Sequence, residues 1–324
     1  MNRNDTFAAP FDTLSRNAIP MTDYTDHSIP LRERMSAYVL ELQNMICKAL
    51  ESFDGSGRFR EDRWERPGGG GGHSRVLADG ERIEKGGVNV SAVHGAMPAA
   101  LTHLISSDAS EFFATGVSLV IHPRSPRVPT VHANFRYFEQ SNGDAWFGGG
   151  ADLTPYIADE KDGRHFHGVL REACDRFDAE LYPRFKKECD RYFHIRHRNE
   201  CRGIGGIFYD YLRGDAEELE RWFAFQRCVG DAFIEAYLPI AERHASEAWT
   251  EREERFQLLR RGRYAEFNLV YDRGTKFGLE TDGRTESILM SLPPLAAWEY
   301  DAEMEQTESE KTLMEWLRKP IEWV

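Results

Sequence analysis

Two neighbouring runs of β-branched and aromatic residues, Val117 to His122 and Thr130 to Glu139, constrain the fold of this chain more than any other feature. Prolines separate the runs, and proline cannot donate a hydrogen bond to a sheet, so each run is predicted to form one strand. Side chains on a strand alternate between the two faces of the sheet. The odd positions are almost wholly apolar: Val117, Leu119, Ile121, Val131, Ala133, Phe135 and Tyr137.

The even positions of the two predicted strands carry mainly polar side chains. They are Ser118, Val120, His122, Thr130, His132, Asn134, Arg136 and Phe138. We expect an antiparallel pair with Val120 opposite Asn134, a register that also places His122 opposite His132. A solvated outer face is the ordinary explanation for such a pattern. However, this face has no Lys or Glu and combines two imidazoles with a guanidinium, so we interpret it as a functional site.

Composition limits the class of protein. The 324 residues, of which 41% are hydrophobic, are enough for a domain with a substantial core. No apolar run approaches the roughly 18 residues that a membrane span needs. The net charge of −13 argues against binding to nucleic acid or to anionic membranes, which requires a basic surface. The five cysteines lack close spacing, so reduced thiols are expected rather than a zinc site.

The beginning of the chain differs from the rest. Residues 1–30 are rich in aspartate and lack a hydrophobic core, so they resemble neither a secretory nor a mitochondrial leader. We interpret this segment as a flexible N-terminal arm on a cytoplasmic protein. Residues 31–324 contain no internal repeat, long linker or break in composition. We therefore expect them to form a single domain.

Glycine residues mark the first half of the predicted domain. After a predicted helix from Leu31 to Phe53, the run Gly68–Gly72 lacks the G-K-[ST] ending of a phosphate loop. A flap beside a site and a disordered connector remain equally open for this run. Asp79-Gly80 predicts the turn of a hairpin. Asp144 to Tyr156 is typical of a strand, and its three consecutive glycines, next to Asp152, indicate a bulge or a group that approaches the backbone closely.

The second half of the chain is predicted to be mixed. A segment with four basic side chains in seven residues, Arg196 to Arg202, precedes a glycine-rich strand and suggests a loop that faces an anion. Together with the hairpins, the pattern predicts an α+β fold with a large, mainly antiparallel sheet flanked by helices on both faces. The predicted helices are within His165 to Ile195, Asp215 to Tyr237, Pro239 to Arg260 and around Leu313 to Leu317; the predicted strands are Tyr264 to Asp272, Thr275 to Thr281 and Ser287 to Leu292.

Five motifs, in this order along the chain, closely resemble the oxygen-dependent coproporphyrinogen III oxidase family. They are Glu84 to Ser91, Val131 to Phe138, Trp146 to Pro155, His197 to Gly206 and Gly262 to Leu269. The resemblance extends from about Leu31 to Val324. It implies oxidative decarboxylation of two propionate groups of coproporphyrinogen III to vinyl groups, which gives protoporphyrinogen IX in haem biosynthesis. Dioxygen is the implied co-substrate, carbon dioxide and hydrogen peroxide are released, and no organic cofactor is needed.

The resemblance also implies an assembly and residue roles. It implies a homodimer with an interface in the Tyr264 to Pro293 region, His132 as proton donor, and possibly a divalent metal cation. The substrate-binding positions that it implies are Ser118, Asn134, Phe135, Arg136, Asp282, Gly283 and Arg284. The positions that it implies for the metal are His122, His132, His167 and His197. Asp282 stands where many relatives have glycine, and its carboxylate would repel propionates.

Physical chemistry agrees with the resemblance. A macrocycle with four propionates is a tetra-anion, and each arginine contact to a carboxylate is worth roughly 1.5–3 kcal/mol. Arg136, Arg202 and Arg284 would supply such contacts. Asp152 would accept hydrogen bonds from pyrrole N–H groups, and His132 would move a proton near the reacting propionate. The alternatives are a tetrapyrrole carrier without turnover and an unrelated oxygenase with a metal bound by the four histidines.

Overall fold

The computed structural model describes residues 24–97, 108–280 and 283–324. Most of the predicted N-terminal arm and the predicted substrate-binding residue Asp282 lie outside these described residues. No helix in the described ranges combines the length and the apolar character that crossing a membrane requires.

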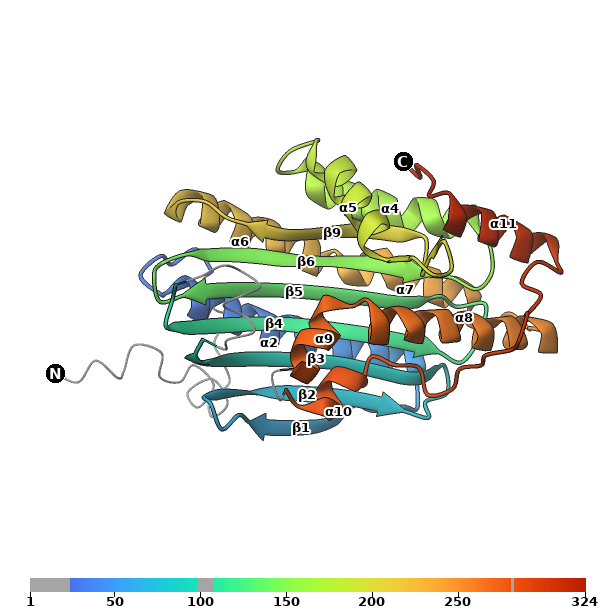
Figure 1. The fold of residues 1–324 in the computed structure, drawn as a ribbon, viewed down its shortest axis with the longest axis horizontal. Helices are drawn as coiled ribbons and strands as arrows, with labels where there is room; N and C mark the ends of the chain where they lie inside the picture. The colour runs from blue at the N-terminus through green and yellow to red at the C-terminus, as the bar shows by residue number, and fades with distance from the viewer. Residues whose placement is uncertain (1–23, 98–107, 281–282) are drawn as a thin grey trace.

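Within the described residues, a seven-stranded antiparallel sheet forms the centre of the molecule (Figure 1). Its strand order is β1-β2-β3-β4-β5-β6-β9, so six strands follow one another along the chain and β9 then pairs with β6. The predicted large antiparallel sheet is confirmed. The strands are β1 (Arg60–Glu65), β2 (Gly70–Ala78), β3 (Ile83–Ala96), β4 (Glu111–Pro123), β5 (Thr130–Gln140), β6 (Ala145–Thr154) and β9 (Gly205–Leu212), with a separate pair of β7 (His194–Ile195) and β8 (Glu200–Cys201).

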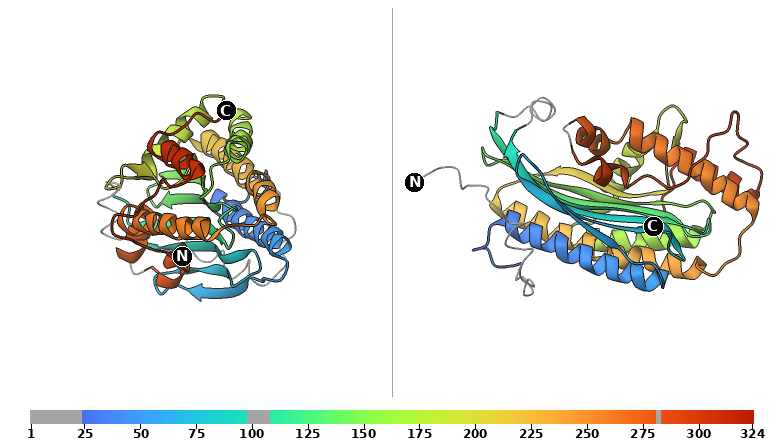
Figure 2. Two further views of the ribbon diagram at one scale, coloured as in Figure 1. Left: turned by 90° about the vertical axis from the view of Figure 1, so that its right-hand side faces the viewer. Right: turned by 90° about the horizontal axis from the view of Figure 1, so that it is seen from below.

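Helices cover both faces of this sheet, as predicted (Figure 2). On one face lie α2 (Leu31–Asp54), α6 (Ala216–Asp231) and α7 (Phe233–His244). On the opposite face, α8 (Glu251–Val270) lies over the sheet, followed by α9 (Arg273–Glu280) and α10 (Thr285–Leu289). The remaining helices are α4 (Glu160–Asp175), α5 (Leu181–Tyr192) and α11 (Glu308–Arg318).

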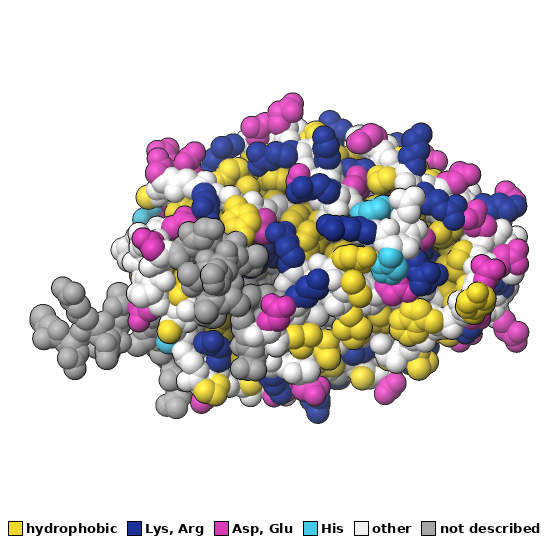
Figure 3. All heavy atoms as spheres, in the orientation of Figure 1, with side chains coloured by type: hydrophobic (Ala, Val, Ile, Leu, Met, Phe, Trp, Pro, Cys, Tyr) yellow, Lys and Arg dark blue, Asp and Glu magenta, His cyan; other side chains and the backbone are white. Residues whose placement is uncertain are grey.

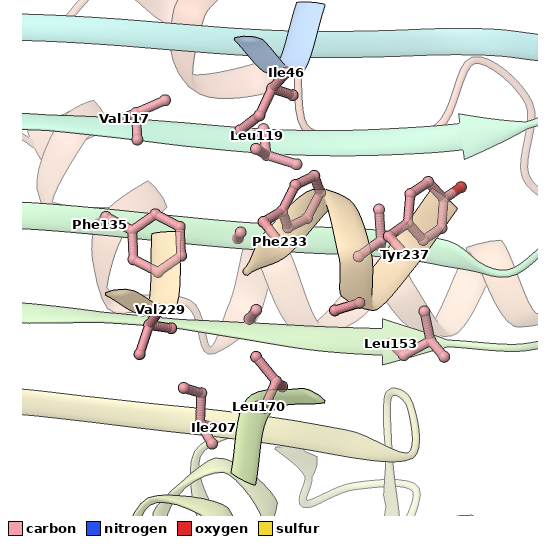
Figure 4. Close-up of a cluster of buried hydrophobic side chains, with 14 of the residues drawn as sticks. Ile46, Val117, Leu119, Phe135, Leu153, Leu170, Ile207, Val229, Phe233 and Tyr237 are labelled. Atoms are coloured by element: carbon pink, nitrogen blue, oxygen red, sulfur yellow. The ribbon is translucent and has the colours of Figure 1, made fainter. Parts of the chain in front are cut away.

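Odd-numbered side chains of β4 and β5 enter the hydrophobic core, as the alternation predicts. Val117, Leu119 and Phe135 are at most 1% exposed, and they lie against side chains of α6 and α7 such as Val229 and Phe233 (Figure 4). The even positions point to the face over which α8 lies. One face of the central strands therefore packs into the core, and the other carries the polar side chains.

The register between β4 and β5 differs from our expectation by two residues. Ser118 pairs with Asn134, and Val120 pairs with His132, so the predicted pairing of Val120 with Asn134 was wrong. A shift of two residues keeps every side chain on the same face. The hydrophobic pattern cannot detect such a shift, because only the length and geometry of the connecting loop decide it.

The predicted strands after residue 260 were also wrong. Tyr264 to Val270 continues α8, residues Thr275 to Glu280 lie within α9, and the Ser287 to Leu292 segment begins within α10. The helix α8 starts with a capping box, in which Thr250 and Glu253 satisfy each other's backbone N–H groups. Once started, it continues through a segment rich in aromatic residues, because tertiary packing overrides their preference for strands.

Two other boundaries differ from the prediction. Pro239 lies inside α7 rather than at the start of a long helix, and the break between α6 and α7 falls at Ala232. The run Gly68–Gly72 is neither a flap nor a connector, because its last three residues begin β2: Gly71 and Gly72 pair with both β1 and β3, and Gly70 pairs with β3. The predicted hairpin at Asp79-Gly80 is confirmed by the turn between β2 and β3.

Neighbouring residues on opposite faces provide a test of this architecture. We predict that Phe135→Ala lowers the free energy of unfolding by about 3–5 kcal/mol, because it leaves a cavity in the core. The adjacent Asn134→Ala, on the half-exposed face, should cost less than about 1.5 kcal/mol. Urea denaturation of both variants measures the difference, and similar values for the two would contradict the assignment of faces.

Candidate active site

Two adjacent strands and the segment before a third bring together a histidine, an aspartate and an arginine. His132 on β5 and Asp152 on β6 are direct cross-strand partners, and Nδ1 of His132 lies 2.8 Å from Oδ1 of Asp152. Arg202 precedes β9 and binds the same carboxylate with two nitrogens. Its Nη2 donates to Oδ1 at 2.9 Å, and its Nε donates to Oδ2 at 3.1 Å.

Arg202 is fixed on all sides. Its Nη1 donates to Oδ1 of Asn268 on α8 at 2.6 Å. The ring centroids of Phe193 and Tyr264 lie 4.1 and 4.5 Å from its guanidinium carbon, within the range of cation–π contact. Its side chain is 3% exposed, and that of Asp152 is 1% exposed. The predicted contacts of Arg202 with a propionate and of Asp152 with pyrrole N–H groups therefore do not fit, since these two residues neutralise each other in the interior.

The ion pair sets the state of the imidazole. Burial alone would raise the pKa of Asp152, but the charge of Arg202 and the contact with His132 hold the pKa below its usual value. An ionised Asp152 accepts the Nδ1–H of His132, so the other nitrogen, Nε2, becomes the one that can exchange a proton. In the described part of the chain Nε2 has no hydrogen-bond partner, and the His132 side chain is 21% exposed. His132 can therefore act as a proton donor or acceptor toward the open face.

Arg136 lies on the same face, two strand positions beyond Asn134. Its Nη1 donates to Oδ1 of Asn134 at 3.1 Å, and its Nη2 lies 3.0 Å from Oδ2 of Asp210 on β9. To reach β9, the side chain crosses β6 at Gly148, where an added Cβ would lie 2.9 Å from the Arg136 Nε. The close approach predicted for the three consecutive glycines is confirmed, and at Gly148 the approaching group is the Arg136 guanidinium.

Four polar residues at even-numbered positions of β4 and β5 are half-buried rather than covered. Ser118, His132, Asn134 and Arg136 all have intermediate exposure on this face. Four of the predicted site residues therefore form one polar surface, called here the open face. On the side of the molecule seen in Figure 1, Lys and Arg side chains lie among apolar ones (Figure 3). Local positive charge is thus available to an anionic ligand despite the acidic total.

Phe135 does not belong to the open face. Its side chain is 0% exposed in the core, on the opposite side of the sheet (Figure 4). The predicted role of Phe135 in substrate binding therefore cannot be a contact of its side chain with a ligand on the open face.

Arg284 and Gly283 lie toward the other edge of the sheet. The Arg284 guanidinium pairs with Asp62 on β1 and is 30% exposed, and Gly283 donates its N–H to the Gly278 carbonyl at 2.8 Å. From β1 to β5 there are four strand spacings of about 4.8 Å, or about 19 Å. Arg284 can share a ligand with Arg136 only if that ligand is large.

The four histidines predicted to bind a metal do not come together. His122 lies between the Thr130 hydroxyl and the Ser291 carbonyl, and burial lowers its pKa to about 3. His167 is buried between the Tyr182 hydroxyl and the Ile204 carbonyl, and burial likewise lowers its pKa to about 3.

His197 lies elsewhere again, between the Tyr271 hydroxyl and the Glu266 carboxylate. Both ring nitrogens of His122, His167 and His197 thus have partners, and these histidines do not fit a common metal ion with His132. Within the described residues, the trio whose ligand atoms lie within 4.8 Å of one another is Asp159 and Asp162, at the start of α4, and His244, at the end of α7. One chain therefore does not bring the four predicted histidine ligands together, and the predicted divalent cation stays a prediction. The sequence could not show this separation, because it gives no distance between histidines on different elements.

Sequence reasoning missed the contribution of α8 and of Asp210. Tyr264, Phe267 and Asn268 all contact Arg202 from α8, a segment that we had predicted to be a strand. Their i, i+3 and i+4 spacing was the available signal, because these positions share one face of a helix. Asp210 lies on the glycine-rich strand β9, and its pairing with Arg136 could not be seen in the sequence.

The buried pair makes a specific prediction about stability and pH. Asp152→Asn leaves the Arg202 charge buried without a partner, and we expect a loss of about 3–5 kcal/mol in the free energy of unfolding. The folded-state pKa of Asp152 is lowered, so its stabilisation is present above the unfolded carboxyl pKa of about 3.9 and is lost as the pH falls through the folded-state pKa.

Denaturation with urea at pH 7 and at pH 3 measures this effect. The difference in the free energy of unfolding between the native protein and Asp152→Asn should be large at pH 7 and smaller at pH 3. Asp144→Asn is the control, because Asp144 forms a half-exposed pair with Arg213 and should contribute about 1 kcal/mol or less. A difference that is independent of pH would contradict an ionised Asp152.

Comparison with known proteins agrees with this geometry. Residues 34–323 match the family model described as coproporphyrinogen III oxidase, and this range includes every residue of the candidate site. The match extends over nearly the whole chain and confirms the resemblance seen in the five motifs. The chain therefore belongs to the coproporphyrinogen III oxidase family, whose place is in porphyrin biosynthesis.

Proposed function

We propose that this protein catalyses the oxygen-dependent reaction: it decarboxylates two propionate groups of coproporphyrinogen III to vinyl groups and gives protoporphyrinogen IX. For each propionate, the carboxylate leaves as carbon dioxide, and the side chain loses a hydrogen with two electrons. Dioxygen accepts these two electrons and this hydrogen. It also takes one proton from solvent or an acid and becomes hydrogen peroxide. The observation that carries the proposal is His132, fixed by Asp152 on the same open face as Arg136.

Substrate binding in this proposal depends on the polar groups of the open face. Arg136 offers guanidinium N–H groups to a propionate, and Ser118 and Asn134 add a hydroxyl and an amide from paired positions. Arg284, about four strand spacings away, is suited to another propionate of the same macrocycle. The predicted contact of Asp282 stays a prediction, because that residue lies outside the described ranges.

Proton transfer is the task of His132. Asp152 accepts from Nδ1, and Nε2 therefore faces the open side, where it can take or deliver a proton at the reacting side chain. The reduced macrocycle is electron-rich and supplies the electrons itself, so the proposal includes no organic cofactor. It assigns no step to a metal ion, since the four histidines occupy separate places.

We further infer a homodimer in the cytoplasm. Large apolar side chains near the end of α8 are exposed, with Leu269 at 50% and Val270 at 46%. Trp298 is 56% exposed, and its Nε1 donates to Glu266, one helical turn before these residues. Adjacent exposed apolar side chains of this size favour a protein interface. This surface lies within the Tyr264 to Pro293 region and its continuation, for which the family resemblance implies a dimer contact.

Oxygen dependence and the role of His132 can be tested together. Purified protein should form the divinyl product from coproporphyrinogen III in air, and it should form none under argon. We expect His132→Ala to lower kcat by about 10²–10⁴-fold, because a positioned acid–base group is lost. His165→Ala is the control, since His165 is half-buried on α4 and contacts the Glu235 carbonyl on α7, away from the open face.

Two outcomes would contradict the proposal. Product formation under argon would exclude dioxygen as the oxidant. Full activity of His132→Ala would exclude its proton transfer. If the native protein and His132→Ala both bind the macrocycle and neither forms product, the protein is a carrier instead.

A further inference from the structure

Asp210 is shared by two arginines that come from distant parts of the chain. It lies on β9 with a side chain that is 16% exposed. Its Oδ2 is 3.0 Å from Nη2 of Arg136, on β5, and 3.5 Å from Nη2 of Arg273, at the start of α9. Its Oδ1 accepts the backbone N–H of Tyr211 at 3.1 Å. One carboxylate, anchored by the backbone, therefore holds two guanidinium groups next to each other.

Arg136 depends on this carboxylate for its direction. The side chain extends across Gly148, where an added Cβ would lie 2.7 Å from Oδ1 of Asp210 and 2.9 Å from the Arg136 Nε. Asn134 binds the other terminal nitrogen of the guanidinium. The Arg136 side chain remains 38% exposed. It is therefore oriented by two partners and still presents N–H groups on the open face.

Arg273 reaches the same carboxylate over an aromatic platform. Its guanidinium carbon is 4.9 Å from the ring centroid of Tyr192, which stacks on Phe208 at 4.1 Å. The Tyr192 hydroxyl donates to Oδ1 of Asp272 at 2.8 Å and accepts the Arg273 backbone N–H at 3.1 Å. The Arg273 side chain is 51% exposed, and its guanidinium pairs with the Asp210 carboxylate.

We propose that Asp210 is a positioning residue, which keeps Arg136 and Arg273 side by side so that both can bind one carboxylate of the macrocycle. The proposal rests on the proposed function and extends it to a residue that does not itself touch the substrate. Two guanidiniums this close repel each other, and Asp210 offsets part of that repulsion. The trio keeps a net charge of +1, which matches a single propionate. The direction of the Arg136 pKa agrees, because burial would lower it but Asp210 raises it.

The test measures recognition of carboxylates separately from the fit of the macrocycle. Binding of coproporphyrin III, the oxidised tetra-acid, and of its tetramethyl ester is followed by fluorescence quenching for the native protein, Asp210→Ala and Asp210→Asn. We expect Asp210→Ala to weaken tetra-acid binding by about 10-fold, the scale of one charge-assisted contact, and to leave ester binding unchanged. Asp210→Asn keeps an oxygen for Arg136 without the charge, and it should lie between the two. In turnover, KM should rise while kcat changes little.

The matched control is again Asp144→Asn, because Asp144, just before β6, pairs with Arg213, just after β9, and has no contact with Arg136 or Arg273 among the described residues. If Asp210→Ala does not fold, Asp210→Asn carries the test. Unchanged or tighter binding of the tetra-acid overturns the proposal, since Asp210 would then be neutral or a competitor of the substrate. An equal loss for acid and ester also overturns it, because it indicates only a structural role. A native protein that prefers acid to ester but shows no turnover would contradict the proposed function and not this inference.

Discussion

The buried pair between Asp152 and Arg202 is the interaction on which the candidate site depends. Two opposite charges are stable in the interior only when they neutralise each other and satisfy their hydrogen bonds, and here two arginine N–H groups bind the two carboxylate oxygens. The pair connects β6, the segment before β9 and, through Asn268, the helix α8. It also fixes the tautomer of His132. Three parts of the fold are thus joined at the point where the chemistry is expected.

The alternation of the central strands separates this chemistry from the core by the thickness of one sheet. Phe135 and Arg136 are neighbours in the chain, yet one is sealed among apolar side chains and the other binds Asp210 on the open face. The glycines of β6 provide room for a long side chain, which alternation alone does not. Without side chains at Gly148, a long residue of β5 can extend to β9 over the strand between them. Rigid strands thereby hold groups from three positions at hydrogen-bonding distance.

Much of the fold and part of the site could be predicted from the sequence. The period of two in residues 117–139 was enough to assign Ser118, His132, Asn134 and Arg136 to one face, and their motifs indicated the family. The pattern could not give the register, because a shift of two preserves the faces. It also could not show that Asp152 and Arg202, fifty positions apart, would bind each other instead of the substrate. The strand-like composition of α8 hid the helix that completes the site.

The order of the strands has a consequence for how the polypeptide matures. Strands β1 to β6 are consecutive neighbours, so their contacts are local in sequence and can form as the chain leaves the ribosome. Asp152 belongs to this early part, whereas its arginine partner is translated fifty residues later. The ion pair can form only after the chain has been made as far as Arg202. The segment before β9 and α8 therefore complete the surroundings of a carboxylate that the earlier strands already contain.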